Sequence, residues 1–261
     1  MLEVNRIYNE DCLGDNGLKL IDDKSIDLIL CDLPYEKTRN KWDSIISMVP
    51  LWKEYKRIIK DRGAIALTAT FDFAAKLYEY KSIPFRYDIV WSKNKTTGFY
   101  NANKMPMRQH ELVLIFYKKL PIYNPQKTYD HKPVNSYKRK VSSAGSNYGA
   151  TKDDMNGGGQ TERHPTSVWD IPVMNNDDPN KWHPTQKPVE LFERIIKSYT
   201  NEGDLVLDNA AGACTTAHAA INTGRQYICF EKEKEYYDRA AEDINEKYIM
   251  RTHGGHYNDT N

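Results

Sequence analysis

The chain has 261 residues, of which 39% are hydrophobic and 28% are charged, as in an ordinary globular protein. This length accommodates one large α/β domain with an inserted segment, or two small domains. Lysine and arginine number 37 and aspartate and glutamate 36, so the net charge of +1 gives no overall basic excess. Only local basic clusters could therefore favour a polyanion.

The cysteines do not indicate a metal site, because no two of them lie at metal-ligand spacing. Cys31 and Cys229 each end an apolar run, which is typical of a buried free thiol. We see no signal peptide and no apolar run of about 20 residues. We therefore expect a reduced, cytoplasmic protein with no membrane span and no bound metal.

The first half of the chain alternates predicted strands with predicted helices. Strands are expected at 25–31, 64–68, 87–91 and 112–117, and helices at 49–60 and 71–80. Asp61-Arg62-Gly63 is expected to end the first helix before the next strand begins. This alternation predicts an α/β fold with a mostly parallel, doubly wound sheet covered on both faces.

Residues 121–182 have a different character. They are rich in Asn, Gly, Ser, Pro and Lys, and Gly157-Gly158-Gly159 marks a flexible point. The basic run Lys138-Arg139-Lys140 lies among scattered tyrosines, a mixture that favours nucleic-acid contact. A stretch this long without periodicity is more often a functional insertion than a surface loop.

Regular elements return after this stretch. Helices are expected at 188–199, 215–223 and 233–247, and strands at 204–208 and 226–230. The first helix begins at Pro188, a favourable first-turn residue. The residues after His253 are expected to fray.

Asp32-Leu33-Pro34-Tyr35 follows a predicted buried strand, at the edge where open α/β sheets bind ligands. An exocyclic amine is a poor nucleophile because its lone pair is delocalised into the ring. The Asp32 carboxylate and the Leu33 carbonyl could accept its two hydrogens and so favour an available lone pair. Pro34 would stiffen the loop, and Tyr35 would stack on an extruded base. Taken alone, these four residues favour an ordinary turn after a strand.

A second ligand-binding pattern runs from Asp208 to Thr216, where a strand, a turn of small residues and a helix start follow one another. Small residues allow close backbone approach, and a helix N-terminus favours a carboxylate. Glu231 ends the next strand, where an acid can bind ribose hydroxyls. The pattern suits a nucleoside cofactor, and the lack of G-x-G-x-x-G disfavours NAD.

The segment from Trp182 to Pro188 precedes an amphipathic helix. His183 could be a catalytic base, although a structural turn at the helix entry is the simpler interpretation. Lys187 is a candidate for holding a cofactor carboxylate.

Together these motifs resemble the β-group DNA amino-methyltransferases, which modify adenine N6 or cytosine N4 in bacteria and phages. The similarity covers nearly the whole chain in the family's order. The matching segments are residues 9–13, 32–35, 91–94, 110–117, 183–188 and 208–216, followed by Glu231. The resemblance implies a Rossmann-like methyltransferase sheet in which the catalytic half precedes the cofactor half.

The resemblance also implies roles for individual residues. Asp11 would bond the adenine amino group of S-adenosylmethionine, and Glu231 would bind its ribose. The methionine part of the cofactor would be surrounded by Asp208, Gly212 and Thr215, with Thr185 and Lys187 near its carboxylate.

The family arrangement implies four segments. Residues 1–120 would form the catalytic half, 121–182 the target-recognition insert with Lys138, Arg139 and Lys140 on DNA, 183–250 the cofactor half and 251–261 a tail. The substrate would be double-stranded DNA in a bacterial or phage-infected cell, and a homodimer is a possible assembly.

Asp32 favours adenine, because the cytosine-N4 relatives more often carry serine there, but cytosine N4 stays open. Two departures from the family pattern matter. Cys214 stands where a second glycine is usual, next to Ala213 in place of a small hydroxyl residue, and Glu36 stands where glycine is common. A thiol at Cys214 could crowd the cofactor. Cys214 and Glu36 therefore leave a catalytically degenerate nucleic-acid-binding module as an alternative. An RNA methyltransferase is a third alternative, because similar loops occur there.

Overall fold

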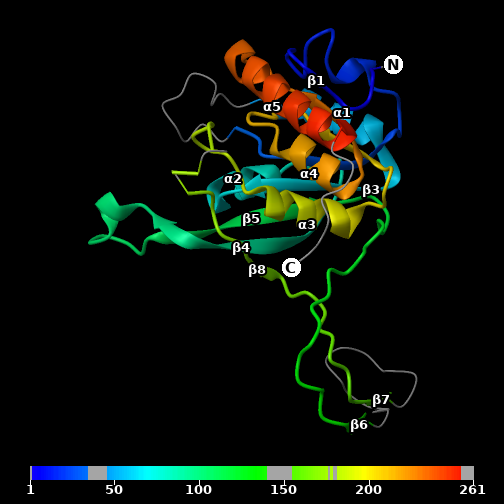
Figure 1. Ribbon diagram of the computed structural model, residues 1–261, viewed down its shortest axis with the longest axis vertical. Coiled ribbons are helices and arrows are strands. Elements are labelled where there is room, and N and C mark those ends of the chain that lie inside the picture. The colour runs from blue at the N-terminus through cyan, green and yellow to red at the C-terminus, as the bar shows by residue number, and fades with distance from the viewer. Residues whose placement is uncertain (1, 35–45, 140–154, 176, 179–180, 254–261) are drawn as a thin grey trace. The chain divides into compact units, whose positions relative to one another are not determined.

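The computed structural model describes residues 2–34, 46–139, 155–175, 177–178 and 181–253. Its contacts divide the chain into two compact units, residues 1–124 with 167–261, and residues 125–166. The first unit contains an eight-stranded sheet and the second a two-stranded one (Figure 1). Among the described residues, no helix is both long and apolar enough to cross a membrane.

The large sheet has the strand order β1-β10-β9-β2-β3-β5-β4-β8. All neighbouring strands are parallel except that β5 runs antiparallel to both β3 and β4. Its strands are β1 (Arg6–Tyr8), β2 (Ile26–Cys31), β3 (Ile59–Ala69), β4 (Phe85–Thr97), β5 (Arg108–Phe116), β8 (Val168–Asp170), β9 (Leu205–Asp208) and β10 (Gln226–Phe230).

In the part of the chain that the structure describes, five α-helices cover the two faces of this sheet. They are α1 (Met48–Ile58), α2 (Phe71–Leu77), α3 (Val189–Tyr199), α4 (Thr215–Thr223) and α5 (Lys234–His253), with short 3-10 turns η1 (Leu18–Leu20) and η2 (Phe99–Asn101). Alternate residues of each central strand face opposite sides. In β2, Leu28 and Leu30 pack with α3 and α4, whereas Ile29 and Cys31 pack with α1 and α2. The predicted doubly wound α/β fold is confirmed.

The expected stop at Asp61-Arg62-Gly63 is wrong. Helix α1 ends at Ile58 and β3 begins at the next residue, so the tripeptide lies inside the strand. The pairing of β3 with β2 shifts there, from Ile26 opposite Ile59 to Leu28 opposite Ala64. A Cβ on Gly63 would lie 2.8 Å from the Asp27 carbonyl oxygen. The glycine therefore permits a bulge rather than ending an element.

Other boundaries also differ from expectation. The short edge strands β1 and β8 were not predicted, and β8 lies within residues 121–182. It pairs with β4, and Trp169 and Ile171 enter the core. Helix α5 extends beyond the predicted residue 247 to His253. The expected fraying after His253 falls outside the described residues.

The second unit contains β6 (Tyr137–Arg139) and β7 (Met155–Gly157), which pair antiparallel. An isolated bridge between Thr128 and Arg163 joins its two chain segments. Lys138 and Arg139 lie on β6, and Lys138 is exposed. Lys140 lies outside the described residues.

Candidate active site

A cavity of about 760 Å³ opens at the carboxyl ends of the parallel strands. Asp32 follows β2, Asp208 ends β9, and Glu231 follows β10, so three acids meet at one sheet edge. The edge includes the β9–β2 junction, where the chain order reverses across the sheet. This is where open α/β sheets bind ligands, because the strands' connections diverge and leave a crevice.

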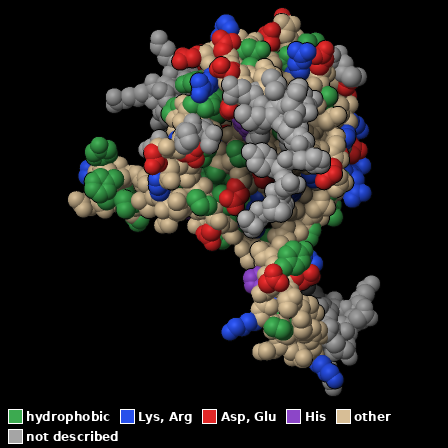
Figure 2. Space-filling view, viewed as in Figure 1, with side chains coloured by type: hydrophobic (Ala, Val, Ile, Leu, Met, Phe, Trp, Pro, Cys, Tyr) green, Lys and Arg blue, Asp and Glu red, His purple; other side chains and the backbone are tan. Residues whose placement is uncertain are grey.

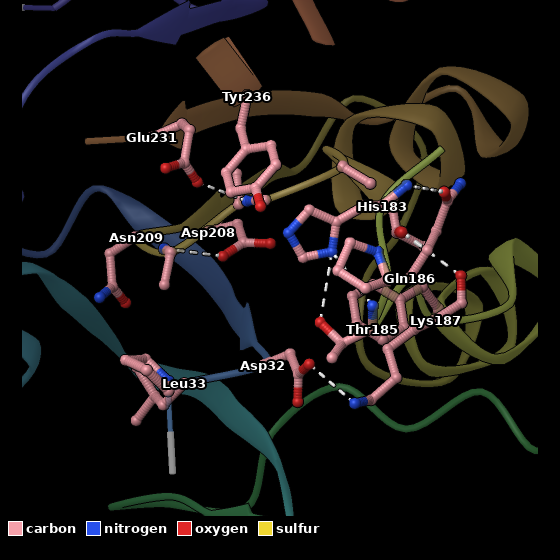
Figure 3. A pocket seen from close by; sticks show the side chains of 18 of the residues that line it. Asp32, Leu33, His183, Thr185, Gln186, Lys187, Asp208, Asn209, Glu231 and Tyr236 are labelled. Atoms are coloured by element: carbon pink, nitrogen blue, oxygen red, sulfur yellow. Dashed lines mark hydrogen bonds and ion pairs between the residues drawn. The ribbon is translucent and has the colours of Figure 1, made fainter. Parts of the chain in front are cut away.

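Asp32 occupies one side of this cavity (Figure 3). One carboxylate oxygen accepts a hydrogen bond from the Thr68 hydroxyl on β3. The other oxygen lies 2.7 Å from the Lys187 ammonium nitrogen. Its side chain is 24% exposed, so the carboxylate is held in place yet accessible from the cavity.

Lys187 connects Asp32 to a second carboxylate, Glu111 on β5, at 3.5 Å. Glu111 also binds Lys93 on β4, whose ammonium lies 4.6 Å from the centre of the Trp91 ring. Burial alone would lower the pKa of Lys187, but the carboxylates of Asp32 and Glu111 outweigh it and raise the pKa. Lys187 is therefore protonated at neutral pH and forms an ion pair with Asp32.

Sequence reasoning did not single out Thr68, Lys93 or Glu111 as site residues. Each of them lies on a strand that was predicted from its apolar residues alone. The polar residue itself gave no periodic pattern. The available clue was a charged residue directly beside an apolar run, as Glu111 stands beside Leu112. That pattern indicates a site only once the order of the strands is known, because β3, β5 and β4 are neighbours in the sheet.

The turn after β9 forms the opposite wall of the cavity. Gly212 has φ +51°, and its backbone N–H donates a 2.7 Å hydrogen bond to Glu231. The other Glu231 oxygen accepts from the Glu233 N–H at 2.8 Å. Burial raises the pKa of Glu231, against these backbone hydrogen bonds. The Glu231 carboxylate therefore links the turn after β9 to the start of the segment after β10.

Asp208 lies beneath this turn and is 2% exposed. Thr216 donates a 2.5 Å hydrogen bond to one oxygen, and the Ala210 N–H donates to the other at 3.1 Å. The Cys31 thiol donates to that second oxygen, also at 3.1 Å. Burial raises the pKa of Asp208 to about 6, against the bonds from Thr216 and Cys31.

Cys214 does not crowd the cavity as its sequence position suggested. Its φ of +53° is the left-handed conformation that glycine adopts without strain. The side chain is fully buried in the core beside Cys229 and does not line the cavity. The backbone therefore follows the path expected for glycine, and the thiol packs away from the ligand space. Glu36 lies outside the described residues.

His183 and Thr185 line a third side of the cavity. The Thr185 N–H lies 3.3 Å from His183 Nδ1, and its hydroxyl lies 3.2 Å from the same nitrogen. The ring packs against Tyr236 at 4.5 Å between centroids. Burial lowers the pKa of His183 to about 4, so the imidazole is neutral at pH 7. Its contacts support the structural turn rather than a proton-transfer role.

Asp11 lies at the remaining edge, after β1. One of its oxygens accepts the Leu13 N–H at 2.9 Å, which fixes the turn. Nearby, Asn209 accepts a 2.5 Å hydrogen bond from buried Tyr55.

The structure brings together every described residue predicted to act in catalysis or cofactor binding. These residues line one cavity: Asp11, Asp32, Leu33, Pro34, Thr185, Lys187, Asp208, Gly212, Thr215 and Glu231. Tyr35 lies outside the described residues, as does Lys140. Lys138 and Arg139 belong to the second compact unit.

The cavity has the chemistry that S-adenosylmethionine requires. Carboxylates suit its sulfonium charge and its ribose hydroxyls, and Ala210, Ala211 and Gly212 allow close backbone approach. The ring of Tyr236 offers an apolar surface for a purine.

Comparisons with known proteins agree with this fit. The sequence profile of a DNA methylase family, covering N6 and N4 enzymes, matches residues 26–242. The DNA adenine methyltransferase YhdJ of Escherichia coli strain K12 is 31% identical over 258 residues, covering 90% of this chain and 80% of its own. The type II methyltransferase M.BglII of Bacillus subtilis is 30% identical over 259 residues, covering 91% of this chain and 68% of its own.

Solved structures share the fold. The M1.HpyAVI–S-adenosylmethionine complex superposes with a TM-score of 0.62 at 21% identity, covering 92% of this chain and 99% of that one. The cytosine-N4-specific PvuII DNA methyltransferase gives 0.63 at 17% identity, covering 95% and 93%. The chain is therefore a member of the β-group DNA amino-methyltransferases, which use S-adenosylmethionine to methylate an exocyclic amino group of a DNA base.

Proposed function

We propose that the protein methylates adenine at N6 in double-stranded DNA. The observation that carries this proposal is the Asp32 carboxylate, which is fixed inside the cavity by Thr68 and Lys187. Serine is more usual at this position in the cytosine-N4 relatives. The similar YhdJ, which covers most of the chain, is named as a DNA adenine methyltransferase.

Asp32 and the Leu33 carbonyl would accept the two amino hydrogens of an adenine turned out of the duplex. Each carboxylate oxygen has two lone pairs, so the bonds from Thr68 and Lys187 leave acceptor capacity on Asp32. The ammonium of Lys187 orients the carboxylate through its 2.7 Å contact. Pro34 would limit the motion of the loop. Catalysis would rest on positioning and on these acceptors, with no covalent enzyme intermediate.

S-adenosylmethionine supplies an electrophilic methyl group when bound. Glu231 would bind its ribose and Asp11 its adenine amino group, while Asp208, Gly212 and Thr215 would surround its methionine part. Thr185 would lie near the carboxylate. We assign Lys187 to Asp32 instead of to the cofactor carboxylate, because its ammonium is 2.7 Å from Asp32 and is enclosed with Glu111.

We also propose that the unit of residues 125–166 recognises the target sequence. It is compact in its own right and presents exposed Lys138 on β6. Along the sequence, it lies between the two halves of the methyltransferase fold, where the family carries its recognition region.

The base can be tested directly in cells. The gene would be expressed in a host that lacks its own DNA methyltransferases, and the plasmid nucleosides would be identified by mass. We expect N6-methyladenine. N4-methylcytosine would contradict the proposed base while retaining the reaction, and it is the alternative product because the matched family covers both N6 and N4 enzymes.

A further inference from the structure

A hairpin at the end of the large sheet projects from the methyltransferase unit (Figure 1). It joins β4 to β5 and spans residues 94–110; we call it the β4–β5 hairpin. All of its residues are exposed. It belongs to the same compact unit as the cavity.

The hairpin is an ordered structure. At its tip, Gly98 has φ +90° and its carbonyl accepts the Asn101 N–H at 2.9 Å. At its base, Gln109 donates to the Lys93 carbonyl at 3.0 Å. Asn94 accepts the Val173 N–H at 3.0 Å, which ties the hairpin to the segment after β8. These contacts define the conformation of the turn and attach the base of the hairpin to its neighbours.

Large apolar side chains gather on this ordered hairpin. Tyr100 is 99% exposed, Phe99 78%, Met105 58% and Met107 41%. The green patch at the end of the arm in Figure 2 shows this concentration. Exposed apolar groups concentrated on a projection gain nothing for the fold, and such patches commonly mark interaction sites.

The hairpin is also basic, although the chain as a whole is nearly neutral. Residues 94–110 contain Lys95, Lys104, Arg108 and His110 and no Asp or Glu. A net charge of about +3 on one projection suits a polyanion. Aromatic rings interleaved with basic side chains are the combination that binds both the bases and the phosphates of nucleic acid.

The hairpin continues directly into the cavity, because Lys95, Thr96 and Thr97 form part of its lining. On the proposed function, a duplex whose base reaches Asp32 must pass beside this hairpin. We propose that the β4–β5 hairpin binds the DNA that flanks the target base. Lys104 and Arg108 contact phosphates, and Phe99 and Tyr100 contact bases. This inference rests on the proposed function and adds a DNA contact separate from residues 125–166.

The test compares DNA binding by two hairpin variants, Lys104→Gln/Arg108→Gln and Phe99→Ser/Tyr100→Ser. The probe is a labelled mixed-sequence duplex, titrated over a series of salt concentrations. The matched controls are Lys53→Gln/Lys81→Gln and Leu120→Ser, which alter exposed side chains outside the hairpin. S-adenosylmethionine affinity and thermal unfolding of each variant report on the fold.

We expect the charge variant to reduce the slope of log affinity against log salt by about 0.9 for each lost phosphate contact. The aromatic variant should weaken binding roughly tenfold or more and leave the slope unchanged. Cofactor affinity should match wild type. A photocrosslinking phenylalanine analogue at position 100, which retains an aromatic ring, should crosslink to the duplex.

Binding by both hairpin variants equal to that of the controls, with no crosslink to DNA, would overturn the inference. A crosslink only to a second copy of the chain would assign the tip to a dimer contact and would also overturn it. The proposed function fails separately, if the wild-type protein transfers no methyl group to DNA.

Discussion

Glu111 is the residue on which the arrangement of Asp32 most depends. Its side chain is 15% exposed and bridges the ammonium groups of Lys93 and Lys187. The positive charges of both lysines outweigh the effect of burial and lower the pKa of Glu111. Without this carboxylate, Lys93 and Lys187 would both lose the negative charge that they share.

We therefore expect Glu111→Gln to lower the free energy of unfolding by about 3–5 kcal/mol, as for other broken buried ion pairs. It should also slow methyl transfer, because Lys187 would bind Asp32 without a competing carboxylate. Denaturant unfolding and initial-rate assays measure the two effects. The Lys93→Met/Glu111→Gln double variant should recover part of the stability. An unchanged free energy of unfolding in Glu111→Gln would show that the ion pairs of Glu111 do not stabilise the fold.

His183 makes a pH-dependent contribution to stability. Its pKa is lowered from 6.5 to about 4 in the folded protein, so protonation favours the unfolded chain. The contribution is fully present above pH 6.5 and is lost as the pH falls through 4. It amounts to about 3 kcal/mol. We expect His183→Asn to show a flatter decline in unfolding free energy between pH 6.5 and 4 than wild type. Parallel curves for the two proteins would contradict this role.

At the scale of elements, the turn between β9 and α4 shows how a departure from a motif can be accommodated. Cys214 has the positive φ of a glycine while its thiol packs in the core. We expect Cys214→Gly to leave S-adenosylmethionine affinity within about threefold of wild type, which is less than 1 kcal/mol. Calorimetric titration checks this. A large gain in affinity would show that the thiol does obstruct the cofactor.

Cys214→Val provides the matched comparison. A β-branched side chain at φ +53° is strained and overpacks a fully buried site. We expect a loss of stability of about 1–3 kcal/mol.

Some elements were predictable because their signals are local. Helix α4 and strand β10 have the predicted boundaries, since glycines and polar residues delimit both. The bulge at residues 60–63 was not predictable, because a glycine that ends a helix and one that permits a bulge look alike in sequence. Strand β8 was missed because three residues at a sheet edge carry too little periodicity.

The candidate site was predictable where residues follow strand ends in motif order, as Asp32, Asp208 and Glu231 do. The network of Thr68, Lys93 and Glu111 was not, because antiparallel β5 brings together residues from distant strands. Their common location depends on sheet order, which no local pattern encodes.

At the scale of the whole molecule, we propose two DNA-binding surfaces, the β4–β5 hairpin and the unit of residues 125–166, which belong to different compact units. We expect the triple variant Lys138→Gln/Arg139→Gln/Lys140→Gln to weaken DNA binding and to flatten its salt dependence, by about 0.9 in slope for each lost phosphate contact. Cofactor affinity should not change. A salt slope equal to that of the control Lys53→Gln/Lys81→Gln would show that Lys138, Arg139 and Lys140 do not contact DNA.

The most direct test of the account measures transfer of labelled methyl from S-adenosylmethionine to mixed-sequence duplex DNA by wild type and Asp32→Asn. We predict labelled N6-methyladenine from wild type. In the variant we predict a rate lower by roughly 100-fold or more, with cofactor affinity largely retained. Near-normal transfer by Asp32→Asn would contradict the catalytic assignment, and absence of label from wild-type reactions would contradict the proposed function.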